Sequence, residues 1–128
     1  MHTQVVRIFL ISLTTLAVVH ILALRFFLYW RYEWFDIPMH LFGGAIVALG
    51  VLAARDLHIP FFDRLVTFKA TIVVVLFVAV IWELFEFIGG ISVIQESFVL
   101  DTATDLIAGI IGGSIGYIVG RSIAELDA

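Results

Sequence analysis

The sequence predicts an all-α membrane protein, a four-span transmembrane helix bundle, from its composition and from the length of its apolar runs. Of its 128 residues, 62% are hydrophobic and only 14% are charged, whereas a soluble domain carries about 25% charged residues. Four runs are long enough to cross a hydrocarbon core, which takes about 20 helical residues. The short alternating segments of a spanning β-barrel are not evident. We therefore expect residues 1–128 to form one integral membrane domain.

The four apolar runs define the expected spans. They cover residues 5–30, 36–54, 66–89 and 101–120. The first run is longer than the usual core of a secretory signal, so we expect it to be retained as a span. Tyr29 belongs to an aromatic cluster after this run, and such clusters are typical of a membrane interface. Pro38 falls in the first turn of the second span, where its missing amide proton costs nothing.

The distribution of basic residues predicts that both termini are cytoplasmic. Cytoplasmic loops retain an excess of Lys and Arg. The connection between the second and third spans contains Arg55, Arg64 and Lys69, whereas the connection through Gln95 and Glu96 contains no basic residue. The expected location is the bacterial cytoplasmic (inner) membrane, which the chain would cross several times.

Three pairs of ionisable residues interrupt the apolar sequence. The pairs are Asp36 with His40, Glu83 with Glu86, and Asp101 with Asp105. Each pair has a helical spacing of three or four residues and lies at one end of a span. With the predicted topology all three pairs lie at the outer face, at similar depth because one helical turn rises only about 5.4 Å. Since ionisable residues inside a bilayer are costly, the pairs predict an outward-facing functional pocket.

A stripe of small residues on the fourth span indicates where its acids point. Asp101 and Asp105 share one helical face with Gly109, Gly112, Gly116 and Gly120. Membrane helices approach one another closely at stripes with GxxxG spacing. The two acids are therefore expected to face neighbouring helices. The stripe from Gly109 to Gly120 is expected to pack within the bundle, with oligomerisation as an alternative.

Five carboxylates and one imidazole at low dielectric cannot all stay ionised and unpaired. The first solution is a divalent metal ion, with all six residues of the three pairs as candidate ligands. Carboxylates suit Mg, Ca or Mn, and a histidine beside them also admits Fe or Zn, while the lack of cysteine excludes thiolate sites. The second solution is protons shared between carboxylates. The third is Arg25, which would pair with an acid or a lipid phosphate.

Three classes of function follow from these solutions. The first is a metal-assisted membrane enzyme acting on a phosphorylated lipid or envelope precursor, with His40 or Glu86 as general base. The second is a proton- or ion-coupled carrier of a small solute. The third is a structural or accessory protein without chemistry, in which Asp36 and Asp101 merely cap helices. Capping does not explain the Glu83 pair, because negative charge is disfavoured at the C-terminal end of a helix.

Other features of the sequence are less informative about function. The chain has no basic patch for nucleic acid, so its expected partners are the lipid bilayer and a lipid-phosphate or small-molecule ligand. His20, in the middle of the first span, is expected to be a hydrogen-bonded packing residue and not a ligand.

The ionisable pairs resemble those of the YjdF-like family of small bacterial inner-membrane proteins and, more distantly, those of the VanZ-like family associated with glycopeptide resistance. The similar stretches are residues 36–44, 82–87 and 101–113. They cover the second to fourth spans in the same order, and the resemblance implies a polytopic envelope protein with this polar site. Where the YjdF-like pattern has a third acid one turn beyond Asp105, this chain has Gly109. It also lacks the basic residue that VanZ-like proteins place just after the equivalent of Asp36.

Overall fold

The computed structural model describes residues 4–89 and 98–126, and within them every regular element is a helix. Four helices are long and apolar enough to span a membrane: α1 (Gln4–Arg25), α3 (Asp36–Asp56), α4 (Phe68–Gly89) and α5 (Phe98–Leu126). The connections contain the short helix α2 (Leu28–Arg31) and the 3-10 helices η1 (Glu33–Phe35) and η2 (Pro60–Arg64). The predicted all-α class with four spanning helices is confirmed. The expected loop through Gln95 and Glu96 lies outside the described residues.

The first long helix ends at Arg25 and does not continue to residue 30 as the hydropathy predicts. Phe27 has a left-handed backbone with φ of 58°, a conformation that a right-handed helix of L-residues does not admit. The chain turns there and resumes as α2, which carries Tyr29 back toward the bundle. Tyr29 is only 9% exposed, so it lies inside the protein and not in an interfacial belt.

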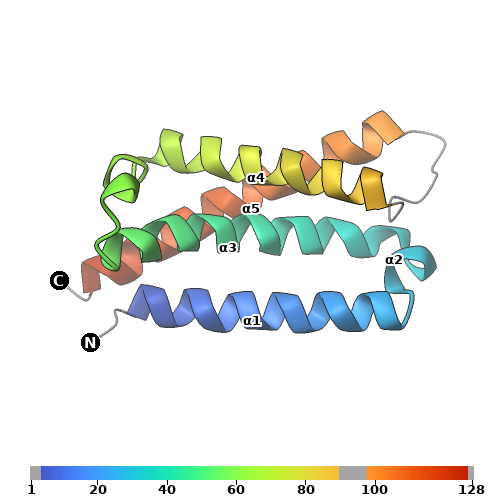
Figure 1. Ribbon diagram of the computed structural model, residues 1–128, viewed down its shortest axis with the longest axis horizontal. Coiled ribbons are helices and arrows are strands. Elements are labelled where there is room, and N and C mark those ends of the chain that lie inside the picture. The colour runs from blue at the N-terminus through green and yellow to red at the C-terminus, as the bar shows by residue number, and fades with distance from the viewer. Residues whose placement is uncertain (1–3, 90–97, 127–128) are drawn as a thin grey trace.

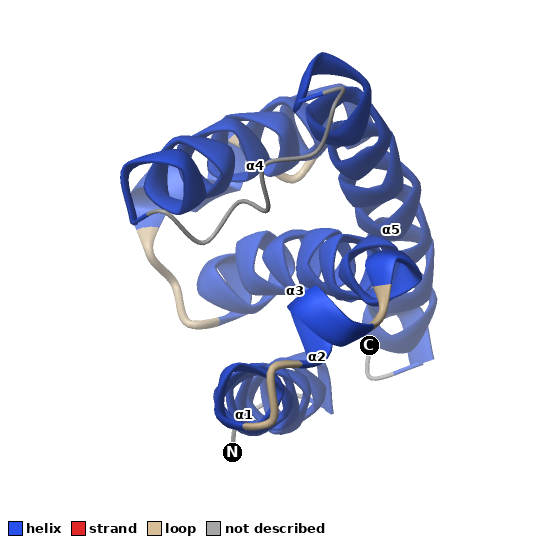
Figure 2. Ribbon diagram, turned by 90° about the vertical axis from the view of Figure 1, so that its right-hand side faces the viewer, coloured by secondary structure: helices blue, strands red, loops and turns tan. Residues whose placement is uncertain are grey.

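Helix α3 is the centre of the bundle. It packs against α1, α4 and α5, with its most extensive contacts to α5. The beginning of α1 and the end of α5 lie at one end of the molecule, and the beginning of α3 and the end of α4 lie at the other (Figure 1). Viewed from that second end, α1 and α4 stand apart on different sides of α3 (Figure 2). This arrangement gathers the ionisable pairs at one end of three helices.

Glycines allow α3 and α5 to approach closely. A Cβ atom added at Gly112 would collide with the carbonyl of Leu41, and one added at Gly44 would collide with the carbonyl of Gly109. The backbones of the two helices are therefore in direct contact, as small residues permit in membrane proteins. The glycine stripe packs inside this bundle, as expected, and a second copy of the chain is not required to cover it.

Replacing Gly112 with alanine tests this contact. We expect Gly112→Ala to destabilise the protein by about 1–3 kcal/mol, because the added methyl group overpacks the α3–α5 contact. Gly43→Ala is the matched control, since a Cβ atom there would meet nothing within 4 Å, and the loss of a helical glycine should stabilise it by about 0.5–1 kcal/mol. Unfolding midpoints in detergent measure both effects. Equal midpoints for the two variants would contradict the close packing.

Candidate metal centre

Ionisable side chains from three helices meet at one end of the bundle. Asp36 and His40 lie in the first two turns of α3, Glu83 and Glu86 lie in the last two turns of α4, and Asp105 lies near the start of α5. The helical spacing within each pair places its members on one side of their helix, and the packing on α3 brings the pairs together. The convergence expected from the sequence is therefore present for these five residues.

The imidazole of His40 lies at the middle of this cluster. Its Nε2 atom is 3.3 Å from Asp36 Oδ1, 3.6 Å from Glu83 Oε1 and 4.0 Å from a carboxylate oxygen of both Glu86 and Asp105. Two overlapping groups of three side chains have their ligand atoms within 4.8 Å of one another: Asp36, His40 and Asp105, and His40, Glu83 and Glu86. Asp105 is 2% exposed and Glu86 is 6% exposed. The cluster therefore lies inside the protein.

Two facing atoms of the cluster lack hydrogen bonds among the described residues. His40 Nε2 and Glu83 Oε1 are both buried, and neither has a hydrogen-bond partner. The separation of 3.3 Å between His40 and Asp36 is that of an ion pair, but it is not accompanied by the alignment that a hydrogen bond requires. Buried polar atoms are nearly always paired. Two adjacent exceptions are typical of a site that receives a further group.

Thr102 orients one of these carboxylates. Its hydroxyl group donates a hydrogen bond of 3.1 Å to Glu83 Oε2, which leaves Oε1 directed toward His40. Partners of this kind fix the orientation of metal-binding side chains in other proteins. Thr102 was not predicted from the sequence, although its position directly after Asp101 in an acidic helix start was an available signal.

Two residues expected at the cluster, Asp101 and Arg25, lie outside its two groups of three. Asp101 belongs to neither group of three and lies one turn closer to the start of α5. Within the described part of the chain, no ion pair joins Arg25 to an acid. Arg25 therefore does not neutralise the carboxylates, and a metal ion or shared protons remain as the solutions.

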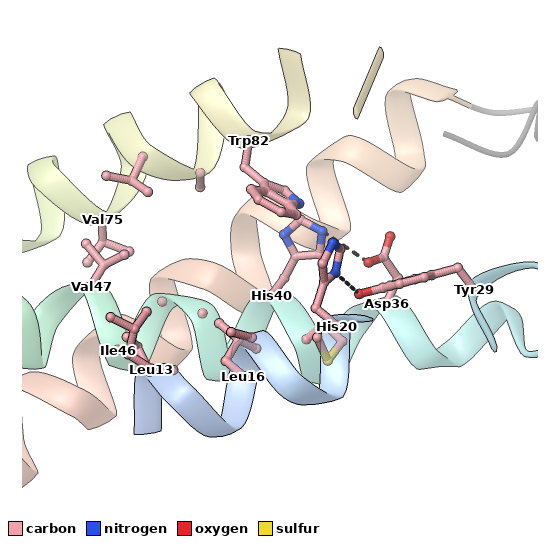
Figure 3. A pocket seen from close by; sticks show the side chains of 16 residues that line it. Leu13, Leu16, His20, Tyr29, Asp36, His40, Ile46, Val47, Val75 and Trp82 are labelled. Atoms are coloured by element: carbon pink, nitrogen blue, oxygen red, sulfur yellow. Dashed lines mark hydrogen bonds and ion pairs between the residues drawn. The ribbon is translucent and has the colours of Figure 1, made fainter. Parts of the chain in front are cut away.

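A second polar group stands beside the cluster. His20 Nδ1 and the Tyr29 hydroxyl oxygen are hydrogen-bonded at 2.8 Å, and the edge of the His20 ring packs on Trp82 (Figure 3). Burial, followed by the negative charges of Asp36 and Glu86, raises the pKa of the Tyr29 phenol above its ordinary value, so the phenol keeps its proton at neutral pH. The expected hydrogen bonding of His20 is confirmed. The position of Tyr29 was missed because the helix break at Phe27 leaves no clear mark in the hydropathy.

An apolar cavity of about 380 Å³ adjoins the cluster. Its walls come from α1, α3 and α4 with Tyr29 of α2, and Asp36 and His40 belong both to its lining and to the cluster (Figure 3). The site therefore combines a buried carboxylate and imidazole centre with a neighbouring hydrocarbon-lined space.

Comparison with known proteins places the chain in a family but assigns it no activity. Residues 1–125 match a family described as "Predicted membrane protein (DUF2238)". Neither the curated proteins nor the solved structures gave a match. The match does not support the VanZ-like resemblance. The chain belongs to the DUF2238 family and is a multi-pass membrane protein.

Proposed function

We propose that this protein binds a divalent metal ion between α3, α4 and α5 and uses it to act on a phosphorylated lipid or envelope precursor. The observation that carries the proposal is the position of His40 Nε2, which is buried, has no hydrogen-bond partner among the described residues and is surrounded by four carboxylate oxygens at 3.3–4.0 Å.

The spacing of these atoms suits a common ion. Ligands about 2.1 Å from one metal ion lie roughly 3.0–3.4 Å from each other when they are adjacent in a tetrahedral or octahedral arrangement. The separations of Asp36 Oδ1 and Glu83 Oε1 from His40 Nε2, 3.3 and 3.6 Å, are close to this range. A small side-chain rotation would bring Asp105, whose Oδ2 atom is 4.0 Å from His40 Nε2, within reach of the same ion.

The ligand set favours a hard or borderline ion. Carboxylate oxygens dominate and one imidazole nitrogen is present, which suits Mg, Mn or Ca and also admits Fe or Zn. One divalent ion offsets two of the negative charges of Asp36, Glu83, Glu86 and Asp105. The remaining charge requires either protons held between carboxylates or a second ion in the other group of three.

The two groups of three suggest different roles for His40 and Glu86. His40 belongs to both groups, so we assign it as a metal ligand. Glu86 belongs to one group only and is 6% exposed, and we assign it as the general base that takes a proton from the attacking water. The bound ion would supply Lewis acidity at a phosphoryl oxygen.

Within its family we place this chain among the YjdF-like proteins of the bacterial cytoplasmic membrane, with both termini cytoplasmic and the cluster near the outer face. The support is the excess of basic residues around η2, where Arg55 and Arg64 lie. Cytoplasmic segments retain such residues.

Metal analysis of the purified protein tests the central proposal. We expect wild type prepared without chelator to contain a divalent ion at fixed stoichiometry. Asp105→Asn should reduce its affinity for the ion at least tenfold, because the variant removes a buried ligand. Glu33→Gln is the control, as Glu33 is an exposed acid at the same end of the bundle. A correctly folded wild type that binds no divalent ion would refute the proposal, and pH-dependent flux in vesicles would then favour a carrier.

The role of Glu86 is tested separately. We expect Glu86→Gln to lower the rate of phosphate release from a lipid phosphate by about 10²–10⁴-fold, the usual contribution of a general base, with a smaller loss of metal affinity than Asp105→Asn. Metal content and phosphate release are measured on the same preparation. Equal losses of metal in the two variants would show that Glu86 acts only as a ligand.

The orientation is tested with single cysteines, because the chain contains none of its own. Trp34 and Phe61 are exposed at opposite ends of the bundle, at 63% and 70%. We expect a membrane-impermeant maleimide to label Trp34→Cys in intact cells and to label Phe61→Cys only after permeabilisation. The reverse pattern would place the cluster at the cytoplasmic face.

A further inference from the structure

We propose that the cavity beside the cluster binds the hydrocarbon chain of a lipid phosphate whose head group reaches the metal at Asp36 and His40. This inference rests on the proposed metal centre, and it adds a chain-binding site and a route by which the lipid enters.

The cavity has the size and walls of a site for a hydrocarbon chain. Its volume of about 380 Å³ lies in the range of about 300–1,000 Å³ that is usual for ligand sites. Its lining includes Leu13 and Ala17 from α1, Val47 from α3 and Val78 from α4. Such walls offer no hydrogen bonds, so they favour an apolar occupant. On α3 the lining runs from Asp36 to Val47, which is about 16 Å of helix.

The cavity is accessible from the side of the bundle. Helices α1 and α4 both pack on α3 and make no extensive contact with each other. Leu13 is 43% exposed and Val78 is 38% exposed, so the walls of the cavity continue into the lipid-facing surface. A Cβ atom at Gly43, on the α3 wall, would meet nothing within 4 Å. A chain already in the bilayer can therefore enter between α1 and α4 without crossing water.

The polar side chains that line the cavity lie together at one of its ends. Asp36 and His40 line that end together with the hydrogen-bonded His20 and Tyr29 (Figure 3). An occupant that satisfies both ends has an apolar chain and a polar head, as a membrane lipid has. The imidazole of His20 and the hydroxyl of Tyr29 supply hydrogen-bonding groups beside the metal position.

The charge of the lining determines how a phosphate head is held. The residues that line the cavity include no Lys or Arg, and Asp36 is acidic. With His40 bound to the metal, an anionic head finds no lysine or arginine in the lining and depends on the bound metal. Mg²⁺ in proteins is commonly shared between carboxylates and a phosphate. Binding of the lipid phosphate should consequently require the metal.

The test uses an alkyl phosphate with a photoactivatable diazirine in its chain and the purified full-length protein loaded with Mn²⁺. We expect cross-links on α1 and α4 at cavity residues such as Ala17 and Val78, and a loss of at least tenfold when Mn²⁺ is chelated. Unlabelled alkyl phosphate should compete with the probe, and inorganic phosphate should compete at least tenfold less well.

Filling the cavity provides the matched variants. Ala17→Phe occupies it from α1 and Gly43→Leu occupies it from α3, so that one remains if the other fails to fold. Both should lower cross-linking at least tenfold with bound Mn²⁺ unchanged. Val18→Phe is the control, because Val18 is the neighbour of Ala17 on α1, is 51% exposed and does not line the cavity. It should leave cross-linking unchanged.

The outcomes separate this proposal from the metal centre. Unchanged cross-linking in Ala17→Phe and Gly43→Leu, or equal competition by inorganic phosphate, would overturn the chain-binding site. Mn²⁺ bound to the same preparations would still support the metal centre. Equal cross-linking of the cavity by an alkyl trimethylammonium probe without metal would overturn the phosphate assignment. Failure of wild type to bind Mn²⁺ would instead refute the proposed function itself.

Discussion

The free-energy cost of burying carboxylates is the constraint on which this structure depends. An ionised carboxylate taken out of water carries a penalty of several kcal/mol unless an opposite charge or hydrogen bonds offset it. Glu86 and Asp105 are almost wholly buried, and among the described residues the only basic group within 4.0 Å of their carboxylates is the imidazole of His40. One imidazole cannot balance the carboxylates around it. A metal ion resolves this imbalance with the ligands already in place.

Helix α3 links the cluster to the rest of the bundle because its different faces contact different helices. Both Gly43 and Gly44 line the cavity, but an added Cβ atom would collide with the α5 backbone at Gly44 and would meet nothing within 4 Å at Gly43. Successive residues of a helix point about 100° apart, so a side chain at Gly44 would point at α5 and one at Gly43 would not. His40, one turn earlier, lies where the cavity and the α5 contact meet. The close α3–α5 contact thereby sets the distance between His40 and Asp105 as well as the stability of the bundle.

The sequence was sufficient to predict the four spanning helices and the convergence of the cluster, because both depend on local patterns of hydropathy and residue spacing. Apolar runs of spanning length can only be helices in a bilayer when no barrel pattern is present. The i,i+4 spacing of Asp36 and His40 places both on one face of α3, and three spans with alternating direction bring their polar ends together. The glycine stripe of α5 was correctly expected to pack inside the bundle, because small residues mark close helix contacts.

The features that sequence reasoning missed depend on tertiary context. The left-handed backbone at Phe27 ends α1 early and turns Tyr29 inward to His20, yet a phenylalanine there is unremarkable in a hydropathy profile. Arg25 seemed close enough in depth to pair with an acid, but depth along a helix does not determine the direction in which a side chain points. Asp101, which shares a helix face with Asp105, belongs to neither group of three, and its role as a ligand stays a prediction.

Coordination of an ion by the imidazole of His40 is the interaction on which the proposed metal centre depends most directly. Pulsed electron paramagnetic resonance of the Mn²⁺-loaded protein measures this, because a nitrogen ligand gives a ¹⁴N coupling that oxygen ligands do not. We predict one such coupling in the wild type and its disappearance in His40→Gln. Bound Mn²⁺ with no nitrogen coupling in the wild type, or a coupling that survives in His40→Gln, would contradict the account.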